Sequence, residues 1–167
     1  AIDPLGDIET IKTELVLADL ETVARSRDKA EKTARGGDRD AKALLSVAEK
    51  LERHLDAGKR ALTLELDPEE KEIARRLFLL TSRPMIFAAN VGEEDLARAA
   101  QLERVQAVRH YAETHVGTEA VVVSAEIEAQ LAELPPAEAA EYLAGLGVSE
   151  SGVETLIRAV YHLLGLR

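Results

Sequence analysis

The sequence predicts a mostly helical α/β chain in which a helical hairpin precedes a strand–helix–strand unit. Three observations predict this class. Ala, Leu, Glu and Arg dominate the 167 residues and aromatic residues make up only 3%, a composition typical of helices. Two apolar seams with helical spacing flank the pair Gly36-Gly37. Two short apolar runs, at 84–89 and 119–123, are separated by a helical pattern.

The first third of the chain predicts two antiparallel helices with a polar tip. We expect Asp7 to cap the first helix, and Gly36-Gly37 to end it. Asp38 is expected to cap the second helix. Residues spaced three or four apart predict the buried face of the first helix: Ile8, Ile11, Leu15, Ala18 and Thr22. The seam of the second consists of Leu44, Ala48, Leu51 and Leu55.

The segment after the hairpin predicts a change of structure. Leu62, Leu64 and Leu66 alternate with polar residues, which indicates a short extended segment. Asp67 followed by Pro68 is a strong helix start, and the helix is expected to stop near Ser82.

The middle of the chain predicts a βαβ unit. The apolar runs 84–89 and 119–123 are expected to be strands, and 94–115 a helix between them, so the strands should be parallel. Two strands alone make no viable sheet, so further strands must come from another chain or from sequence outside this one. The last third predicts helices at 126–134, 137–146 and 153–164, the last capped by Ser149.

Composition excludes several classes of function. A net charge of −10 argues against a generic binder of phosphate backbones, and no DNA partner is expected. The absence of Cys excludes thiol chemistry and Cys-based metal sites, and the His spacing suggests no metal site. No run approaches about 18 apolar residues, so no membrane span is expected. The first residues lack both Met and a signal-peptide pattern, and they look like the interior of a longer cytoplasmic protein.

Polar residues follow both predicted strands. Asn90-Val91-Gly92-Glu93 follows the first, and Ser124-Ala125-Glu126 follows the second. Ligands of open α/β sheets bind at the carboxyl ends of parallel strands, and these groups could grip the rim of a purine. The alternative is structural: Asn90 forms a turn, Glu93 complements a helix dipole, and Ser124 caps a helix.

Basic residues gather around the predicted tip of the hairpin, with Arg35, Arg39 and Lys42 nearest the turn. Acidic residues lie among them, so the tip is either a solvated charged face or a surface that meets RNA or the ribosome.

The two strand-end motifs resemble the fourth and fifth nucleotide-binding motifs of GTPases. The usual fourth motif is Asn-Lys-x-Asp, and a version ending in Glu without the Lys resembles the YchF family, the Obg-like ATPases. Further segments resemble that family in order along nearly the whole chain: 3–11, 13–20, 79–84, 121–125, Glu128, 131–134, 150–153 and 157–159.

The resemblance implies a P-loop nucleotide hydrolase with a doubly wound parallel sheet, an inserted coiled-coil hairpin and a C-terminal TGS domain, associated with ribosomes and using ATP or GTP. By this resemblance Asn90 would orient the base and Val91 would meet its edge through backbone atoms. Glu93 would stand in place of the Asp that recognises guanine. The resemblance therefore does not require guanine to be the base that is bound. Ser124 and Ala125 would complete the base pocket.

A phosphate-binding loop, Gly-x4-Gly-Lys-Ser/Thr, is absent from the chain, as are the switch segments and the TGS domain. We therefore expect residues 1–66 to be the hairpin insert with its return segment, and 67–167 the C-terminal half of the nucleotide domain. The chain alone is expected to be inactive and to contain no catalytic residue, with Mg²⁺ bound only in the full-length protein. The competing interpretation is a non-enzymatic helical interaction module whose βαβ unit is purely structural.

Overall fold

The computed structural model describes residues 2–166, and their contacts form two compact units. One unit is Gly6–Pro84, and the other comprises the residues before Gly6 together with those from Met85 onward. Residues 67–84 thus pack with the hairpin in this structure. The expected division at 66 and 67 concerns the organisation of a whole nucleotide domain, and it stays a prediction.

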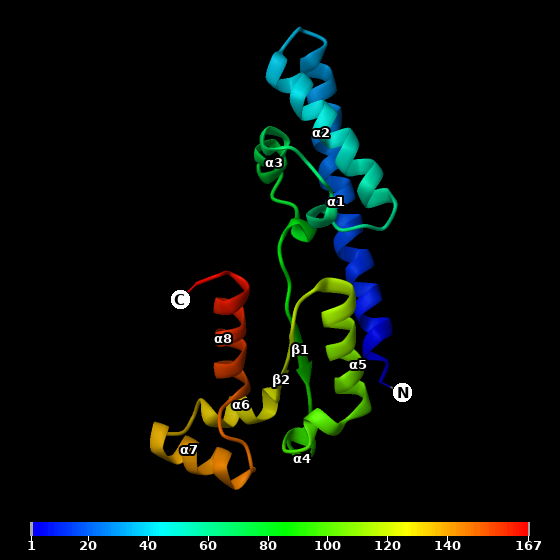
Figure 1. Cartoon of the computed structure of the whole chain (residues 1–167). Helices are drawn as coiled ribbons and strands as arrows, with labels where there is room; N and C mark the ends of the chain where they lie inside the picture. The colour runs from blue at the N-terminus through cyan, green and yellow to red at the C-terminus, as the bar shows by residue number, and fades with distance from the viewer. Residues whose placement is uncertain (1, 167) are drawn as a thin grey trace. The chain divides into compact units, whose positions relative to one another are not determined.

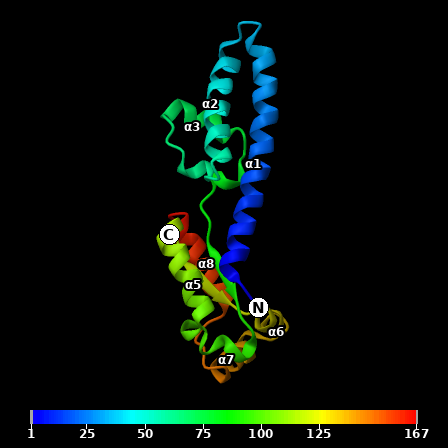
Figure 2. The same cartoon turned by 90° about the vertical axis from the view of Figure 1, so that its right-hand side faces the viewer.

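The first unit is built on two long antiparallel helices joined by a tight turn, α1 (Pro4–Ala34) and α2 (Arg39–Asp56) (Figures 1 and 2). Asp38 caps α2 as predicted, since its Oδ1 accepts a hydrogen bond from the Ala41 nitrogen at 2.9 Å. Gly37 in the turn has φ +89°, a left-handed conformation that only glycine adopts at little cost. The seam of α2 is confirmed: Ala48, Leu51 and Leu55 are buried and Leu44 is half-buried.

The start and the buried face of α1 differ from the prediction. The helix begins at Pro4, a residue favoured in the first turn, so Asp7 lies inside the helix and does not cap it. The buried residues are Val16, Asp19, Val23, Ala30 and Ala34, whereas Ile11 and Ala18 are exposed. The buried face is thus rotated toward Asp19, a charged residue that an apolar pattern does not select.

The segment that follows α2 contains no strand. The expected extended stretch instead begins with a 3₁₀ turn, η1 (Ala61–Thr63), whose Thr63 hydroxyl contacts His54 Nε2 at 2.9 Å. Helix α3 (Pro68–Arg75) starts as predicted, with a capping box between Asp67 and Glu70, but it ends well before Ser82. A second 3₁₀ turn, η2 (Leu80–Ser82), replaces its predicted last turns.

The second unit contains the predicted parallel strand pair. Strand β1 (Phe87–Asn90) pairs with β2 (Ala120–Val123), with Asn90 opposite Val123 at the carboxyl ends. Helix α5 (Glu103–Tyr111) packs on both strands and α8 (Gly152–Leu163) packs on β2, so the two helices flank the pair (Figure 1).

The helix expected at 94–115 is broken into four pieces: α4 (Glu93–Leu96), η3 (Ala99–Gln101), α5 and a π-helical segment, η4 (Ala112–Val116). Asp95 explains the first break. Its buried carboxylate accepts hydrogen bonds from Arg98, at 2.7 and 3.0 Å, and from Arg104. These bonds hold the chain in a compact turn and lower the pKa of Asp95 below its usual value, since the guanidinium groups bond to the charged form.

Three further helices follow β2: α6 (Ala125–Leu131), α7 (Pro136–Gly145) and α8. Ser151, rather than the expected Ser149, caps α8, because its hydroxyl accepts from the Glu154 nitrogen in a capping box. Large apolar side chains of α8 and just beyond it stay exposed: Val153, Ile157, Tyr161, Leu164 and Leu166. Within residues 2–166, no helix is both long enough and apolar enough to span a membrane.

Candidate functional site

The carboxyl ends of the two strands are joined by the side chain of Asn90. Its Oδ1 accepts a hydrogen bond of 3.0 Å from the backbone nitrogen of Ala125, the first residue of α6. Both residues are exposed. The two motifs selected by the strand-end rule, 34 to 35 positions apart in the chain, therefore meet at one place.

Val91 follows Asn90 and points its side chain into the core. It is 5% exposed and packs in a cluster with Ala99 and Val105. Its nitrogen donates to the Val123 carbonyl at 2.9 Å, which extends the strand pairing by one residue. The side chain of Val91 is therefore enclosed in the core, and its nitrogen is used in the strand pairing.

Ser124 is buried, at 2% exposure, between β2 and α6. It occupies the N-cap position of α6, but its side chain makes no capping bond, and no partner for its Oγ is found among the described residues. A buried hydroxyl without a hydrogen-bond partner is uncommon in folded proteins. Helix capping does not account for the burial of this hydroxyl, because the side chain makes no capping bond.

Glu93 is the first residue of α4 and is half-buried beside a residue that the sequence did not single out, Tyr142 of α7. Burial raises the pKa of Tyr142, and the nearby carboxylates of Glu93 and Glu126 raise that pKa further. The Tyr142 hydroxyl also donates to Gln130 of α6. Helices α4, α6 and α7 therefore converge around one phenol. Nothing in the apolar spacing of α7 marks Tyr142, because its importance depends on tertiary contacts.

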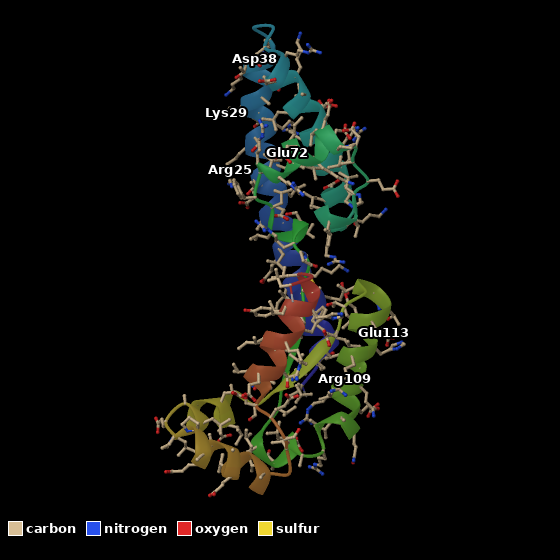
Figure 3. All side chains as sticks on the ribbon, turned by 60° about the vertical axis from the view of Figure 1, so that its left-hand side comes forward. Arg25, Lys29, Asp38, Glu72, Arg109 and Glu113 are labelled. Atoms are coloured by element: carbon tan, nitrogen blue, oxygen red, sulfur yellow. The ribbon has the colours of Figure 1, made fainter. Side chains whose placement is uncertain are left out.

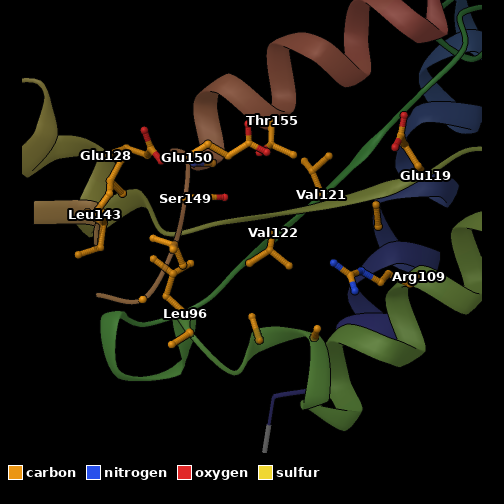
Figure 4. Close-up of a pocket in the computed structure, with 18 residues that line it drawn as sticks. Leu96, Arg109, Glu119, Val121, Val122, Glu128, Leu143, Ser149, Glu150 and Thr155 are labelled. Carbon is orange, nitrogen blue, oxygen red and sulfur yellow. Dashed lines mark hydrogen bonds between the residues drawn. The ribbon is translucent and has the colours of Figure 1, made fainter. Parts of the chain in front are cut away.

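A groove of about 500 Å³ lies elsewhere on the same unit (Figure 4). Its floor is apolar, with Leu96, Val121 and Val122, and charged residues line it, among them Arg109 and Glu150. None of the five strand-end residues predicted from the sequence lines this groove. The groove and the strand-end site are therefore separate features of the surface.

The tip of the hairpin exposes Arg35, Arg39 and Lys42. Arg35 forms an ion pair of 2.8 Å with Glu31 one turn earlier, so one of the three cations is partly neutralised. Arg25 and Lys29 project from α1 below the turn that carries Asp38 (Figure 3). The tip thus mixes both signs of charge, with most of the bases on its outer surface.

Acidic residues at the start of α3 serve the helix. Asp67 and Glu70 form the capping box, and Glu70 also pairs with Lys50 of α2. Among residues 2–166, no group of three or more His, Asp or Glu side chains is arranged to hold a metal ion.

The fold corresponds to part of a P-loop-type GTPase structure. The YchF GTPase of Schizosaccharomyces pombe superimposes with a TM-score of 0.78 at 26% identity, over 98% of this chain and 44% of that one. No family model matches the sequence.

Curated relatives agree with this structural match. The chain is 40% identical over 165 residues to the ribosome-binding ATPase YchF of Bacillus subtilis, and 40% identical over 166 residues to that of Escherichia coli O157:H7. It is 32% identical over 145 residues to the Obg-like ATPase 1 of Oryza sativa subsp. indica. The first two alignments cover 99% of this chain but 45% of the relative, so the chain spans about half the length of the proteins it matches. The predicted resemblance to the YchF and Obg-like ATPase family is confirmed, for a part of such a protein.

Proposed function

We propose that this chain supplies the base-binding part, and the helical arm, of a YchF-type protein that binds and hydrolyses ATP or GTP at the ribosome. We place that protein in the cytoplasm, where ribosomes work. The relatives named as ribosome-binding ATPases support the activity and the partner. The alternative, a helical module without a nucleotide, is the outcome if the experiments below find no binding.

The hydrogen bond between Asn90 Oδ1 and the Ala125 nitrogen is the observation that carries the proposal. It fixes the two strand-end turns against each other before any ligand arrives. Because Oδ1 is used inside the protein, the side-chain NH₂ of Asn90 is the group that we expect to donate to the base. The carbonyl of Val91 and the backbone around Ala125 would frame the base edge, and the buried Ser124 hydroxyl lies at the bottom of this turn.

The carboxylate of Glu93 explains why guanine need not be preferred. An Asp at this position would accept from the ring N–H and the exocyclic amine of guanine, whereas a Glu is longer by one methylene and displaces the carboxylate. Glu93 lies near Tyr142 of α7, and after burial its carboxylate is the next cause that raises the pKa of that phenol. Adenine would then be accepted through backbone contacts. The preference between adenine and guanine would depend on which polar groups of the site each base leaves without a hydrogen-bond partner.

The residues present fit a base better than a phosphate chain. The strand-end turns offer the side-chain amide of Asn90 and backbone groups, which match the edge of a purine. The chain contains no Gly-x4-Gly-Lys-Ser/Thr sequence to hold β- and γ-phosphates or a Mg²⁺ ligand. We therefore assign phosphate and Mg²⁺ binding, and hydrolysis itself, to sequence outside this chain.

Nucleotide titration of the protein expressed from its complete reading frame tests the base assignment. The double variant Asn90→Ala, Glu93→Ala should bind ATP and GTP at least about tenfold more weakly than the wild type, since it loses a donor and the Ala125 clamp. Glu133→Ala, an exposed residue just after α6, is the matched control. Unchanged affinity and base selectivity in the double variant would refute the assignment.

We also propose that the hairpin tip contacts ribosomal RNA through Arg35, Arg39 and Lys42. These side chains are exposed around the Gly37 turn, whereas the protein as a whole carries a charge of −10. A local cluster of cations is what contact with a phosphate backbone requires.

Co-sedimentation with ribosomes tests the tip. Charge reversal of Arg39 and Lys42 to Glu should weaken co-sedimentation and make the remaining binding less sensitive to salt. The control is Arg75→Glu with Arg76→Glu, because both side chains are exposed at the end of α3 and the net charge changes by the same amount. Equal co-sedimentation of all three proteins would contradict a role for the tip.

A further inference from the structure

Helix α8 begins in direct contact with the end of β2. A Cβ atom on Gly152 would lie 2.8 Å from the Cα of Val123 and 3.0 Å from the Val122 carbonyl oxygen, closer than side chains are found. Only glycine therefore allows the first turn of α8 to approach this closely. Val123 is the last residue of β2 and directly precedes Ser124, so the contact lies at the origin of the strand-end turn.

Glu128 connects the same turn to α8 through its side chain. The Glu128 nitrogen donates to the Ser124 carbonyl at 2.9 Å, which makes it part of the first turn of α6. Its Oε1 accepts from the Gly152 nitrogen at 2.6 Å and from the Val153 nitrogen at 3.3 Å. A carboxylate at a helix N-terminus is favoured by the unpaired N–H groups and by the helix dipole.

The strand-end turn is therefore held from two sides. Asn90 of β1 bonds to the Ala125 nitrogen from one side, and Glu128 ties the turn to α8 on the other. The first of these contacts belongs to the base site already described. The second involves no residue of that site, and nothing in the helix spacing of α6 requires a carboxylate at position 128.

We propose that Glu128 is a positioning residue for nucleotide binding: by anchoring α6 to the first turn of α8, it fixes Ser124 and Ala125 where they meet the base. This proposal rests on the proposed function. Glu128 does not touch the ligand itself. Its carboxylate is engaged by α8, and its effect on the base comes through the backbone that it holds in place.

Three variants in the protein from its complete reading frame test the proposal, with binding of ATP and GTP as the measurement. Glu128→Gln keeps an oxygen that can accept from Gly152 and should bind both nucleotides within about threefold of the wild type. Glu128→Asp keeps the charge but is too short to reach, and Glu128→Ala has no acceptor. Both should bind about tenfold more weakly. Glu133→Ala, which removes an exposed glutamate just after α6, should bind normally.

Amide hydrogen exchange on the same proteins separates positioning from general loss of structure. In Glu128→Asp and Glu128→Ala, exchange should rise at Gly152 and Val153 and in the turn after Val123, while α5 stays protected. Full nucleotide affinity in Glu128→Asp despite faster exchange at Gly152 would overturn the proposal, as would a loss of affinity in Glu128→Gln equal to that in Glu128→Ala. Failure of the proposed function is distinguishable, because the wild type would then bind neither nucleotide, or the double variant Asn90→Ala, Glu93→Ala would bind both as tightly as the wild type.

Discussion

The carboxylate of Asp19 in α1 holds Thr81, 62 positions further along the chain, by two hydrogen bonds. Oδ2 accepts from the Thr81 backbone nitrogen at 2.7 Å and from its hydroxyl at 2.6 Å. Both residues are almost fully buried, and the Thr81 hydroxyl in turn accepts from the Ala61 nitrogen at 2.9 Å. One acid thus links α1 to η2, and through η2 to η1, and so closes the hairpin unit at its base.

Replacing Asp19 should therefore destabilise the hairpin unit. Asp19→Ala leaves the Leu80 nitrogen, the Thr81 nitrogen and the Thr81 hydroxyl without their acceptor, and the two Thr81 groups are buried. We expect the free energy of unfolding to fall by about 3 kcal/mol. Chemical denaturation measures this value. Asp7→Asn, an exposed acid of α1, should change it by less than about 0.5 kcal/mol, and equal effects of both variants would show that the Asp19 bonds contribute little.

Phe78 is the one described non-glycine residue with a left-handed backbone, at φ +51°, and its side chain is 77% exposed. A bulky L-residue is strained there, whereas glycine is not. Phe78→Gly should therefore be more stable than Phe78→Ala by about 1 kcal/mol. Both variants lose the aromatic ring. The difference between their unfolding midpoints therefore reports only the backbone conformation at position 78. A Gly variant less stable than the Ala variant would mean that this conformation is unstrained.

The Asp95 network predicts a dependence of stability on pH. Arg98 and Arg104 hold the pKa of Asp95 below its usual value in the folded chain. Asp95 therefore contributes stability that is present above the unfolded-state pKa and is lost as the pH falls through the lower, folded-state pKa. The unfolding temperature of the wild type should exceed that of Asp95→Asn at pH 7, and the gap should narrow below about pH 4. A gap independent of pH would exclude this ion pair as its source.

The contact between Glu93 and Tyr142 can be read from the titration of the phenol. Glu93 raises the pKa of Tyr142, so Glu93→Gln should bring that pKa closer to the usual value for tyrosine. NMR titration of the tyrosine ring carbons assigns the change to Tyr142 rather than to Tyr111 or Tyr161. Glu133→Gln should leave the pKa of Tyr142 unchanged. An identical pKa of Tyr142 in the wild type and in Glu93→Gln would show that the two side chains do not interact.

The sequence predicted elements whose pattern is local. The seam of α2, the Asp38 cap, the start of α3 and the parallel pairing of the strands expected at 84–89 and 119–123 all follow from spacing, capping residues and connection length, although the paired residues are 87–90 and 120–123. The buried face of α1 and the break after Asp95 could not be predicted in this way. Each depends on a buried acid whose partners, Thr81 and Arg104, become neighbours only on folding.

The candidate site likewise contains contacts that the sequence predicted and contacts that it could not predict. The strand-end rule selected Asn90 and Ala125 from the sequence, and the structure brings them within hydrogen-bonding distance. Nothing in the sequence pattern marks Tyr142. Glu128 and Gly152 belong to the segments that resemble the family, but their contact with each other could not be predicted, because it arises where α8 returns to β2 and α6. Gly152 directly follows Ser151, which caps α8, whereas the sequence pattern pointed to Ser149 as the cap.

The most direct measurement of the central claim is the change in the NMR spectrum of the isotopically labelled protein, from its complete reading frame, on adding ATP or GTP. If the strand-end turns bind the base, the backbone resonances of Ser124 and Ala125 and the side-chain amide of Asn90 should shift first and most. Gly37 at the hairpin tip should stay unchanged. Shifts confined to the groove lined by Arg109 and Glu150, with Asn90 and Ala125 unmoved, would contradict the assignment of this site to the base.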